Sequence, residues 1–204
     1  LIKAGVKLQK KERKVLEITR AINYTNPYRD IDIHVIPSDR FRITFMVEYP
    51  LTALGTQYEA IYNMEEDFAF EVAPARTFCF LSEVEMLKER GLIKGGALDN
   101  AVVIIDKVID TNEMKRLKDL FGVEHNITQG ANGILNGKVL RFKNEPVRHK
   151  TLDLIGDLAL LGVPIKGHVT AARAGHASNV EFVKKIKKAY SKELNLLRSE
   201  SNNG

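Results

Sequence analysis

The chain has few of the residues that build cross-linked or metal-rich small modules. Its 204 residues include one cysteine, Cys79, and no tryptophan. One cysteine excludes an internal disulfide framework and a cysteine-rich zinc module. No apolar run approaches the roughly 20 residues that a membrane-spanning helix needs, and the first residues lack a secretory signal pattern. We therefore expect a globular protein in the cytoplasm.

Common nucleotide and nucleophile motifs are also missing. The sequence contains neither GxxxxGK[ST] nor GxGxxG, which excludes the usual phosphate-binding loops. It has no Gly-x-Ser-x-Gly elbow for a catalytic serine. The net charge of +5 permits a polyanionic partner, such as nucleic acid, acidic lipid or a phosphorylated small molecule. The basic side chains gather near the two ends, where we expect solvated faces or linkers and no nucleic-acid interface.

The order of apolar and polar residues predicts the fold class. Residues 30–36 and 41–49 alternate apolar and polar side chains, which is typical of antiparallel strands with one buried face. Residues 145–161, which stop at Gly162, and the segment from 179 onward have helical apolar spacing. Strands followed by helices predict an α+β two-layer sandwich, in which a mostly antiparallel mixed sheet packs against two main helices.

The segments between these elements are predicted in less detail. We expect a helix over 64–73, a second helix from Ser82 to Arg90 with Ser82 as its N-cap, and a buried strand at 101–105. An irregular polar excursion at the surface, containing one short helix, is expected at about 110–137. A further strand is expected at 139–142, and another at 167–173.

The stretch from Glu145 to Asp157 contains the first candidate site. Pro146 suits the first turn of a helix, where its missing N–H costs nothing. On that helix His149, Asp153 and Asp157 are spaced four residues apart, so they lie near one face. An imidazole and a carboxylate one turn apart can bind a divalent metal together. The alternative is an exposed His–Asp pair that adds a few tenths of a kcal/mol to the helix.

Two further positions have side chains suited to catalysis. His176, in a Gly-His turn before a helix, can serve as a general acid, with Asp157 to orient it. Thr77, at a loop-to-helix junction, can donate a hydrogen bond to a developing oxyanion. Each residue alone also fits an ordinary solvated side chain. Together they supply a metal pair, a proton donor, an orienting carboxylate and an oxyanion donor.

Four segments resemble one enzyme family. They are Ala75–Phe78, Gly91–Ala101, Val147–Asp157 and Ala174–Asn179, and they resemble UDP-3-O-acyl-N-acetylglucosamine deacetylase, which carries out the committed step of lipid A synthesis in Gram-negative bacteria. The segments occur in the order found in that family, and the resemblance covers roughly residues 13 to 190.

The resemblance implies a role for each candidate residue. His149 and Asp153 match two zinc ligands. His176 matches the histidine that protonates the leaving amine, and Asp157 matches its partner. Thr77 matches the residue that helps to polarise the acetyl carbonyl.

The same resemblance implies residues that bind the substrate. Lys150 matches a motif lysine beside the metal that suits an anionic substrate. We expect it to act as a catalytic residue as well. Phe78 matches a residue of the sugar site. The helix-strand segment at about 76–104 matches an insert into the two-layer domain that forms an apolar passage for the acyl chain, although its apolar side chains also fit an ordinary core. The candidate wall residues are Val84, Leu87, Ile93 and Ala97, and Gly96 is a further candidate for substrate binding.

The departures from the family are equally informative. In the family a first domain supplies the third zinc ligand, a histidine, and the glutamate that acts as general base. No segment here matches that motif, so the chain resembles the second, C-terminal domain alone, with an incomplete zinc site and no activity in isolation. We expect a connector at 1–13, the domain at 14–195 and a linker tail at 196–204. The other reading is a non-catalytic basic module that binds nucleic acid or a partner protein.

The excursion at 110–137 is longer than in the simplest members. It resembles the forms that are fused to a β-hydroxyacyl-[acyl-carrier-protein] dehydratase, which would make the longer protein bifunctional. The expected partners are therefore the UDP-sugar substrate with its acyl chain, the first domain and a fused dehydratase domain.

Overall fold

A five-stranded sheet lies at the centre of the computed structural model, which describes residues 2–5, 7, 10, 13–50, 54–91, 101–121 and 127–202. The strand order is β2-β3-β9-β4-β5. β4 and β9 are parallel, and the other neighbours are antiparallel. The mostly antiparallel mixed sheet is therefore confirmed. Its strands are β2 (Ile22–Asn26), β3 (Ile31–Ile36), β4 (Arg42–Glu48), β5 (Thr56–Ile61) and β9 (His168–Ala172).

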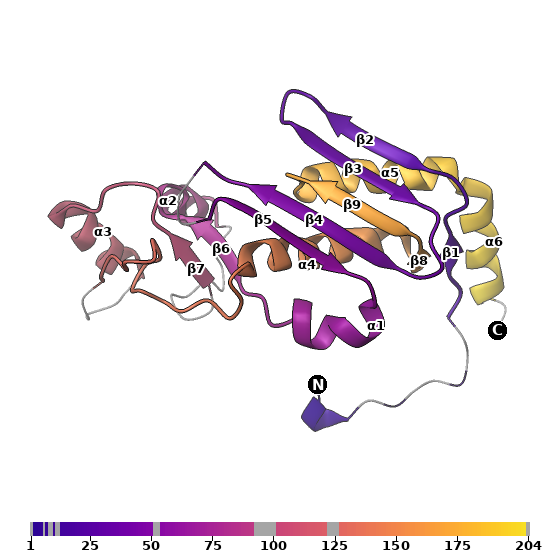
Figure 1. Cartoon of the computed structure of the whole chain (residues 1–204), viewed down its shortest axis with the longest axis horizontal. Helices are drawn as coiled ribbons and strands as arrows, with labels where there is room; N and C mark the ends of the chain where they lie inside the picture. Colours follow the sequence, from indigo (N-terminus) through magenta and orange to yellow (C-terminus); the bar gives the residue numbers. More distant parts are fainter. Residues whose placement is uncertain are drawn as a thin grey trace.

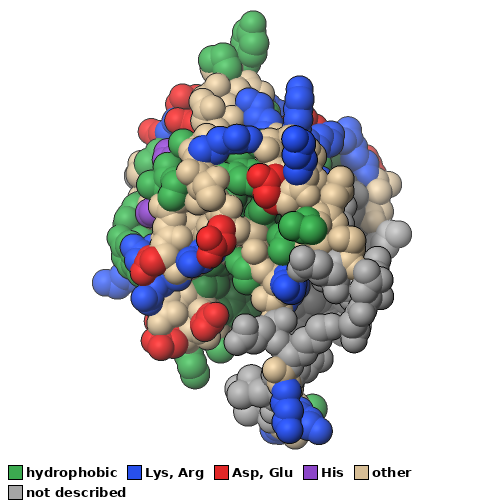
Figure 2. Space-filling model, turned by 90° about the vertical axis from the view of Figure 1, so that its right-hand side faces the viewer, with side chains coloured by type: hydrophobic (Ala, Val, Ile, Leu, Met, Phe, Trp, Pro, Cys, Tyr) green, Lys and Arg blue, Asp and Glu red, His purple; other side chains and the backbone are tan. Residues whose placement is uncertain are grey.

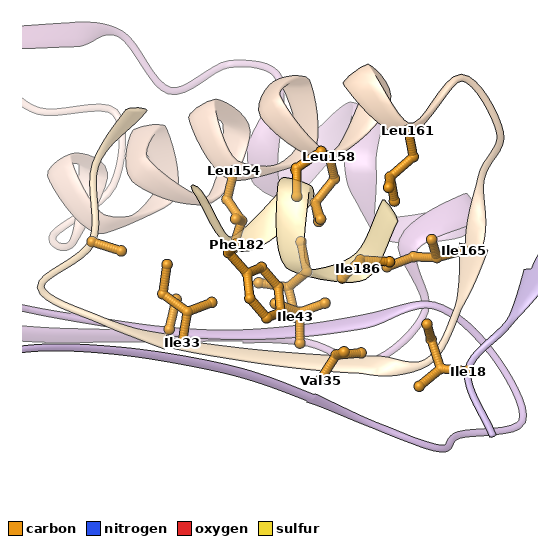
Figure 3. Packing of buried hydrophobic residues seen from close by; sticks show 14 of the residues in the cluster. Ile18, Ile33, Val35, Ile43, Leu154, Leu158, Leu161, Ile165, Phe182 and Ile186 are labelled. Carbon is orange, nitrogen blue, oxygen red and sulfur yellow. The ribbon is translucent and has the colours of Figure 1, made fainter. Parts of the chain in front are cut away.

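Two long helices cover one face of this sheet (Figure 1). They are α4 (Glu145–Leu158), extended by a 3₁₀ turn at Ala159–Leu161, and α5 (His176–Ala189). The burial of β3 alternates along the strand, so that Ile33 and Val35 face the helices. Figure 3 shows side chains of both helices pointing toward the strands across this core. The predicted α+β two-layer packing is confirmed.

The ends of the two helices follow from local chemistry. Pro146 lies in the first turn of α4, and Gly162 ends the helix region with φ of 82°, a conformation that glycine adopts without strain. α5 begins at His176, so the expected start near residue 179 is wrong. Ser178 Oγ accepts a hydrogen bond from the Gly175 N–H at 2.9 Å. This cap starts the helix before its apolar stripe begins.

The insert and the segment 110–137 after it form a second, smaller unit at one end of the sheet (Figure 1). Its elements are β6 (Thr77–Phe80), α2 (Leu81–Glu89), β7 (Ala101–Ile104) and α3 (Thr111–Phe121), with β6 and β7 paired in parallel. The expected N-cap at Ser82 is wrong, because α2 already begins at Leu81. Ser82 instead donates its hydroxyl hydrogen to the Asp106 carboxylate.

The segment 110–137 takes part in the core of this unit. Leu117, Ile127 and Leu135 are buried together with Leu81 and Val84 of α2. The sequence predicted an irregular surface excursion here, and the predicted short helix is α3. The expectation of a surface insertion is wrong for these three side chains, because they complete the core that the insert cannot bury alone.

The expected strand at 139–142 is absent, and the backbone there bonds to side chains and not to a neighbouring strand. The Val139 carbonyl accepts a hydrogen bond from Arg76, and the Arg141 N–H donates to the Glu145 carboxylate. These side-chain partners satisfy backbone groups that a strand would pair.

The remaining elements are short or lie at the ends of the described chain. They are a 3₁₀ turn at Ile2–Ala4, α1 (Met64–Asp67) with a π-helical turn (Phe68–Val72), the parallel pair β1 (Leu16–Glu17) and β8 (Ile165–Lys166), and α6 (Ser191–Asn202). Part of the segment 196–204 that was expected as a linker tail is helical, because α6 continues to Asn202. Among the described helices, none has the length and apolar character to cross a membrane. Figure 2, which shows the right-hand side of the molecule as drawn in Figure 1, has Lys and Arg side chains interspersed with acidic and apolar ones.

Candidate functional site

One stripe of helix α4 carries the candidate residues. Glu145, His149, Asp153 and Asp157 follow one another at intervals of four residues, so they lie on a slowly turning line along the helix. The other side of α4 is anchored in the core, where Leu154 is completely buried. The apolar face therefore fixes the helix on the sheet and leaves the polar stripe directed toward the insert and the start of α5.

His149 and Asp153 present one nitrogen and one oxygen to the same space. His149 Nε2 lies 3.4 Å from Asp153 Oδ1, and both side chains are largely buried. His149 Nδ1 lies 3.2 Å from the carbonyl oxygen of Ala75. Because a carbonyl only accepts hydrogen bonds, Nδ1 carries a hydrogen, and Nε2 is the ring nitrogen that faces Asp153. Two ligand atoms of a tetrahedral zinc ion also lie about 3.4 Å apart, so this pair fits two corners of such a site.

A third ligand is not supplied by the part of the chain that the structure describes. No group of three or more His, Cys, Asp or Glu side chains within the described residues is placed to hold a metal ion. A catalytic zinc ion takes three protein ligands and a water. His149 and Asp153 therefore match part of a ligand set.

His176 is held beside this pair by a carboxylate. Its Nδ1 lies 2.9 Å from Asp157 Oδ2, and its Nε2 lies 3.8 Å from Asp153 Oδ1. Asn179 donates from Nδ2 to the same Asp157 oxygen at 2.8 Å. The imidazole is exposed while its carboxylate partner is mostly buried. A carboxylate that orients an exposed imidazole in this way suits proton transfer at the free ring nitrogen.

Lys150 and the start of β6 border the site on the insert side. Lys150 Nζ lies 3.2 Å from Asp153 Oδ2 and 5.8 Å from the centre of the Phe78 ring. Thr77 is exposed as the first residue of β6, and not at a loop-to-helix junction as the sequence predicted. It follows Ala75 by two residues, and the Ala75 carbonyl contacts His149, so the structure brings the base of the insert to His149 and Asp153.

A comparison with known proteins gives one matching family. The model of the UDP-3-O-acyl N-acetylglycosamine deacetylase (LpxC) family matches residues 1–127 and 121–188 of this chain. The chain belongs to this deacetylase family. The resemblance found in the sequence is thus confirmed at the level of the family.

Similar proteins include both fused and single-function deacetylases. The "Bifunctional enzyme LpxC/FabZ" of Chlorobaculum tepidum is 50% identical over 189 residues, which are 92% of this chain and 40% of that protein. The deacetylase of Syntrophotalea carbinolica is 42% identical over 186 residues, or 91% of this chain and 52% of that protein. The Chlamydia pneumoniae deacetylase is 40% identical over 187 residues, or 91% of this chain and 57% of that protein. The chain thus spans roughly half the length of these relatives.

Of the residues expected to bind substrate in the insert of this deacetylase-family chain, the structure describes Val84 and Leu87 in addition to Phe78. Val84 is 1% exposed and belongs to the second core, which is the ordinary role that the sequence left open. Leu87 is half-buried. Ile93, Gly96 and Ala97 lie outside the described residues.

Three residues near the site were missed by the sequence analysis. Tyr49 packs edge-on against Phe78, and burial, with the charges of Glu83 and Asp153, raises the pKa of Tyr49 to about 12, so its hydroxyl stays protonated at neutral pH. Arg29 lines an open hollow that includes His176. Asn179 fixes Asp157 from the first turn of α5. Tyr49 and Arg29 belong to no local motif. Asn179 ends the segment Ala174–Asn179, but its contact with Asp157 is visible only in the folded chain.

Proposed function

We propose that the chain carries half of the active site of a zinc-dependent deacetylase. The enzyme would hydrolyse the N-acetyl group of UDP-3-O-acyl-N-acetylglucosamine in lipid A biosynthesis, in the cytoplasm. The observation that carries this proposal is the juxtaposition on α4: His149 and Asp153 form a possible ligand pair with a 3.4 Å separation, and His176 stands beside it on Asp157. Membership of the deacetylase family supports the reaction class.

This chain would supply two zinc ligands, the contact that orients one of them and the proton donor for the leaving amine. His149 and Asp153 would bind the zinc ion, and the Ala75 carbonyl accepts a hydrogen bond from His149 Nδ1, so that Nε2 would be the nitrogen that binds the metal. A zinc ion bound there would polarise the amide carbonyl and lower the pKa of a bound water to about 7. His176 would protonate the departing amine from Nε2 while its Nδ1 donates a hydrogen bond to Asp157.

Substrate binding would use the insert side of the site. Thr77 would donate its hydroxyl hydrogen to the carbonyl oxygen as negative charge develops there. The Lys150 ammonium suits the phosphates of a UDP-sugar, and Phe78 would lie against the sugar. Ile93 and Ala97 remain proposed contacts for the acyl chain, and Gly96 remains a proposed contact for the substrate.

The rest of the site would come from outside this chain. We infer that another part of a longer protein supplies the third zinc ligand and the glutamate that accepts a proton from the water. A fused dehydratase domain is a further proposed partner, because some similar proteins are named as bifunctional. The isolated chain would then fold but not turn over substrate. Deacetylation by the purified isolated chain would contradict this inference.

The test compares four single substitutions in the full-length protein. We expect His149→Ala and Asp153→Ala to lose zinc and activity. His176→Ala should keep zinc and lose about 10²–10⁴-fold in kcat, because general acid catalysis contributes about that much. His34→Ala is the control, because His34 lies on strand β3 and is no part of the stripe. Metal content and kcat are measured for each variant.

Two results would overturn the assignment. Equal zinc content in the His149, Asp153 and His176 variants would remove the proposed ligand roles. Salt-sensitive binding to nonspecific duplex DNA that persists in His149→Ala, in a protein without zinc or deacetylation, would favour the basic binding module.

A further inference from the structure

The first residue of α4 is a carboxylate that is withdrawn from solvent. Glu145 is 0% exposed, although it begins a helix whose next turns carry His149 and Asp153. A buried charge is costly unless it is paired and hydrogen-bonded. Neither the proposed ligand pair nor the proposed proton donor uses this group directly.

Four hydrogen bonds satisfy the Glu145 carboxylate. Oε1 accepts from the Arg76 backbone N–H at 2.9 Å and from Arg76 Nε at 2.8 Å. Oε2 accepts from Arg76 Nη2 at 2.9 Å and from the Arg141 N–H at 2.7 Å. Burial by itself would raise the pKa of Glu145, but the bonds from Arg76 and Arg141 outweigh it and hold the pKa below its usual value. The carboxylate is therefore ionised and bidentate toward Arg76.

Arg76, the main partner of Glu145, lies in the sequence between two residues of the proposed site. Arg76 follows Ala75, whose carbonyl oxygen meets His149 Nδ1, and it precedes Thr77. His149 itself lies one turn after Glu145 on the same helix. The carboxylate thus joins the helix that carries the proposed metal ligand to the backbone that orients that ligand and carries the proposed oxyanion donor.

We propose that Glu145 is a positioning residue, which sets Ala75 and Thr77 against His149 through its bidentate bond to Arg76. This inference rests on the proposed function, because His149 and Thr77 take their roles from it. Glu145 touches neither substrate nor metal in this account. Its removal should act on metal affinity and on kcat, because the misplaced groups are those that bind the metal and the carbonyl oxygen.

The first experiment is Glu145→Gln in the full-length protein. The amide keeps the shape but turns an NH₂ toward donors, so one pair of bonds is lost. We expect zinc affinity and kcat to fall about 10- to 100-fold, as when partners behind metal ligands are removed, while KM changes by less than about twofold. Zinc affinity is measured by competition with a chelator, and thermal unfolding is recorded in parallel.

Glu59→Gln is the matched control. Glu59 is also a largely buried carboxylate at this end of α4, and it accepts from Asn144 and pairs with Arg148. Within the described part of the chain Glu59 makes no hydrogen bond or ion pair with residues 75–77, so this variant should lose stability without loss of zinc affinity or kcat. Equal losses of kcat and zinc affinity in both variants would show that Glu145 acts only through stability and would overturn the proposal.

A milder variant covers the case in which Glu145→Gln does not fold. Arg76→Lys keeps the charge and the backbone bond but loses the guanidinium fork, and we expect a fall of about tenfold in kcat with full zinc occupancy at saturating metal. An unchanged kcat together with unchanged zinc affinity would overturn the proposal. His149→Ala, assayed in parallel, separates the two ideas: if it keeps zinc and activity, the proposed function itself fails.

Discussion

The sheet layer and the insert are built with different amounts of apolar packing. The sheet, α4 and α5 share one large continuous cluster of buried side chains, whereas the insert and the following segment have two small clusters. The proposed site lies where the two units meet. The α4 and α5 side of the site therefore packs on a large core. The insert side depends on small cores and on the Glu145–Arg76 contact.

The largest expected effect is in the core of the sheet layer. Phe182 is 0% exposed and packs between α4 and the sheet. Phe182→Ala should cost about 3–5 kcal/mol in unfolding free energy, because it leaves a cavity in a close-packed region. Urea unfolding followed by circular dichroism measures this loss. A loss below about 1 kcal/mol would show that this layer is not the main source of stability.

A substitution in the core of the smaller unit should have a smaller and more local effect. Leu117 is 1% exposed in the second cluster, and Leu117→Ala should cost about 2–3 kcal/mol. Hydrogen exchange should rise in β6, β7 and α3 but not in β3 or β9, because a weak unit opens separately. Exchange that rises equally in all five strands of the sheet would contradict the division into two units.

Acid should weaken the contact between the two units. The pKa of Glu145 is lowered in the folded chain, so its contribution is complete above the usual value of 4.5 and is lost as the pH falls through the lowered pKa. At pH 7 we expect Glu145→Gln to be less stable than wild type by about 1.5 kcal/mol, since hydrogen bonds to a charged group are lost. That difference should shrink at low pH, and a difference that is constant with pH would contradict this.

The smallest expected effect concerns the cysteine of the insert. Burial, with the charges of Glu83 and Asp106, raises the pKa of Cys79 to about 11. Since the thiolate is the nucleophile, alkylation of the folded chain at pH 8 should be much slower than that of free cysteine. Iodoacetamide labelling followed by mass spectrometry gives the rate. Leu117→Ala should speed labelling more than Phe182→Ala does at equal temperature in the folded state.

The sequence predicted the sheet layer better than the insert, for a physical reason. Alternation in 31–36 and 42–48 reflects one buried face, and Gly162 marks a left-handed helix end. Such patterns are local. The wrong predictions at Ser82 and 139–142 arose where side chains from distant segments, Asp106 and Arg76, supply the bonding partners.

In the candidate site, too, contacts within one helix could be predicted from the sequence, whereas contacts between distant segments could not. His149 and Asp153 are one helical turn apart, so their contact follows from spacing alone. Arg76 and Glu145 are 69 positions apart in the chain, and Asn179 reaches Asp157 from another helix. Spacing along one sequence cannot reveal such pairs, and they are what gives the site its orientation.

The hydrogen bonds near Glu145 also bring together the two ends of the smaller unit, residues 74–76 and 139–141. Arg76 enters β6, and it also bonds the Val139 carbonyl, while Arg141 reaches back to the Pro74 carbonyl. The chain between them therefore leaves and returns at one fixed point. Because the cost of closing a loop grows only slowly with its length, we expect the part of this segment beyond β6 to tolerate changes in length without moving the residues on α4.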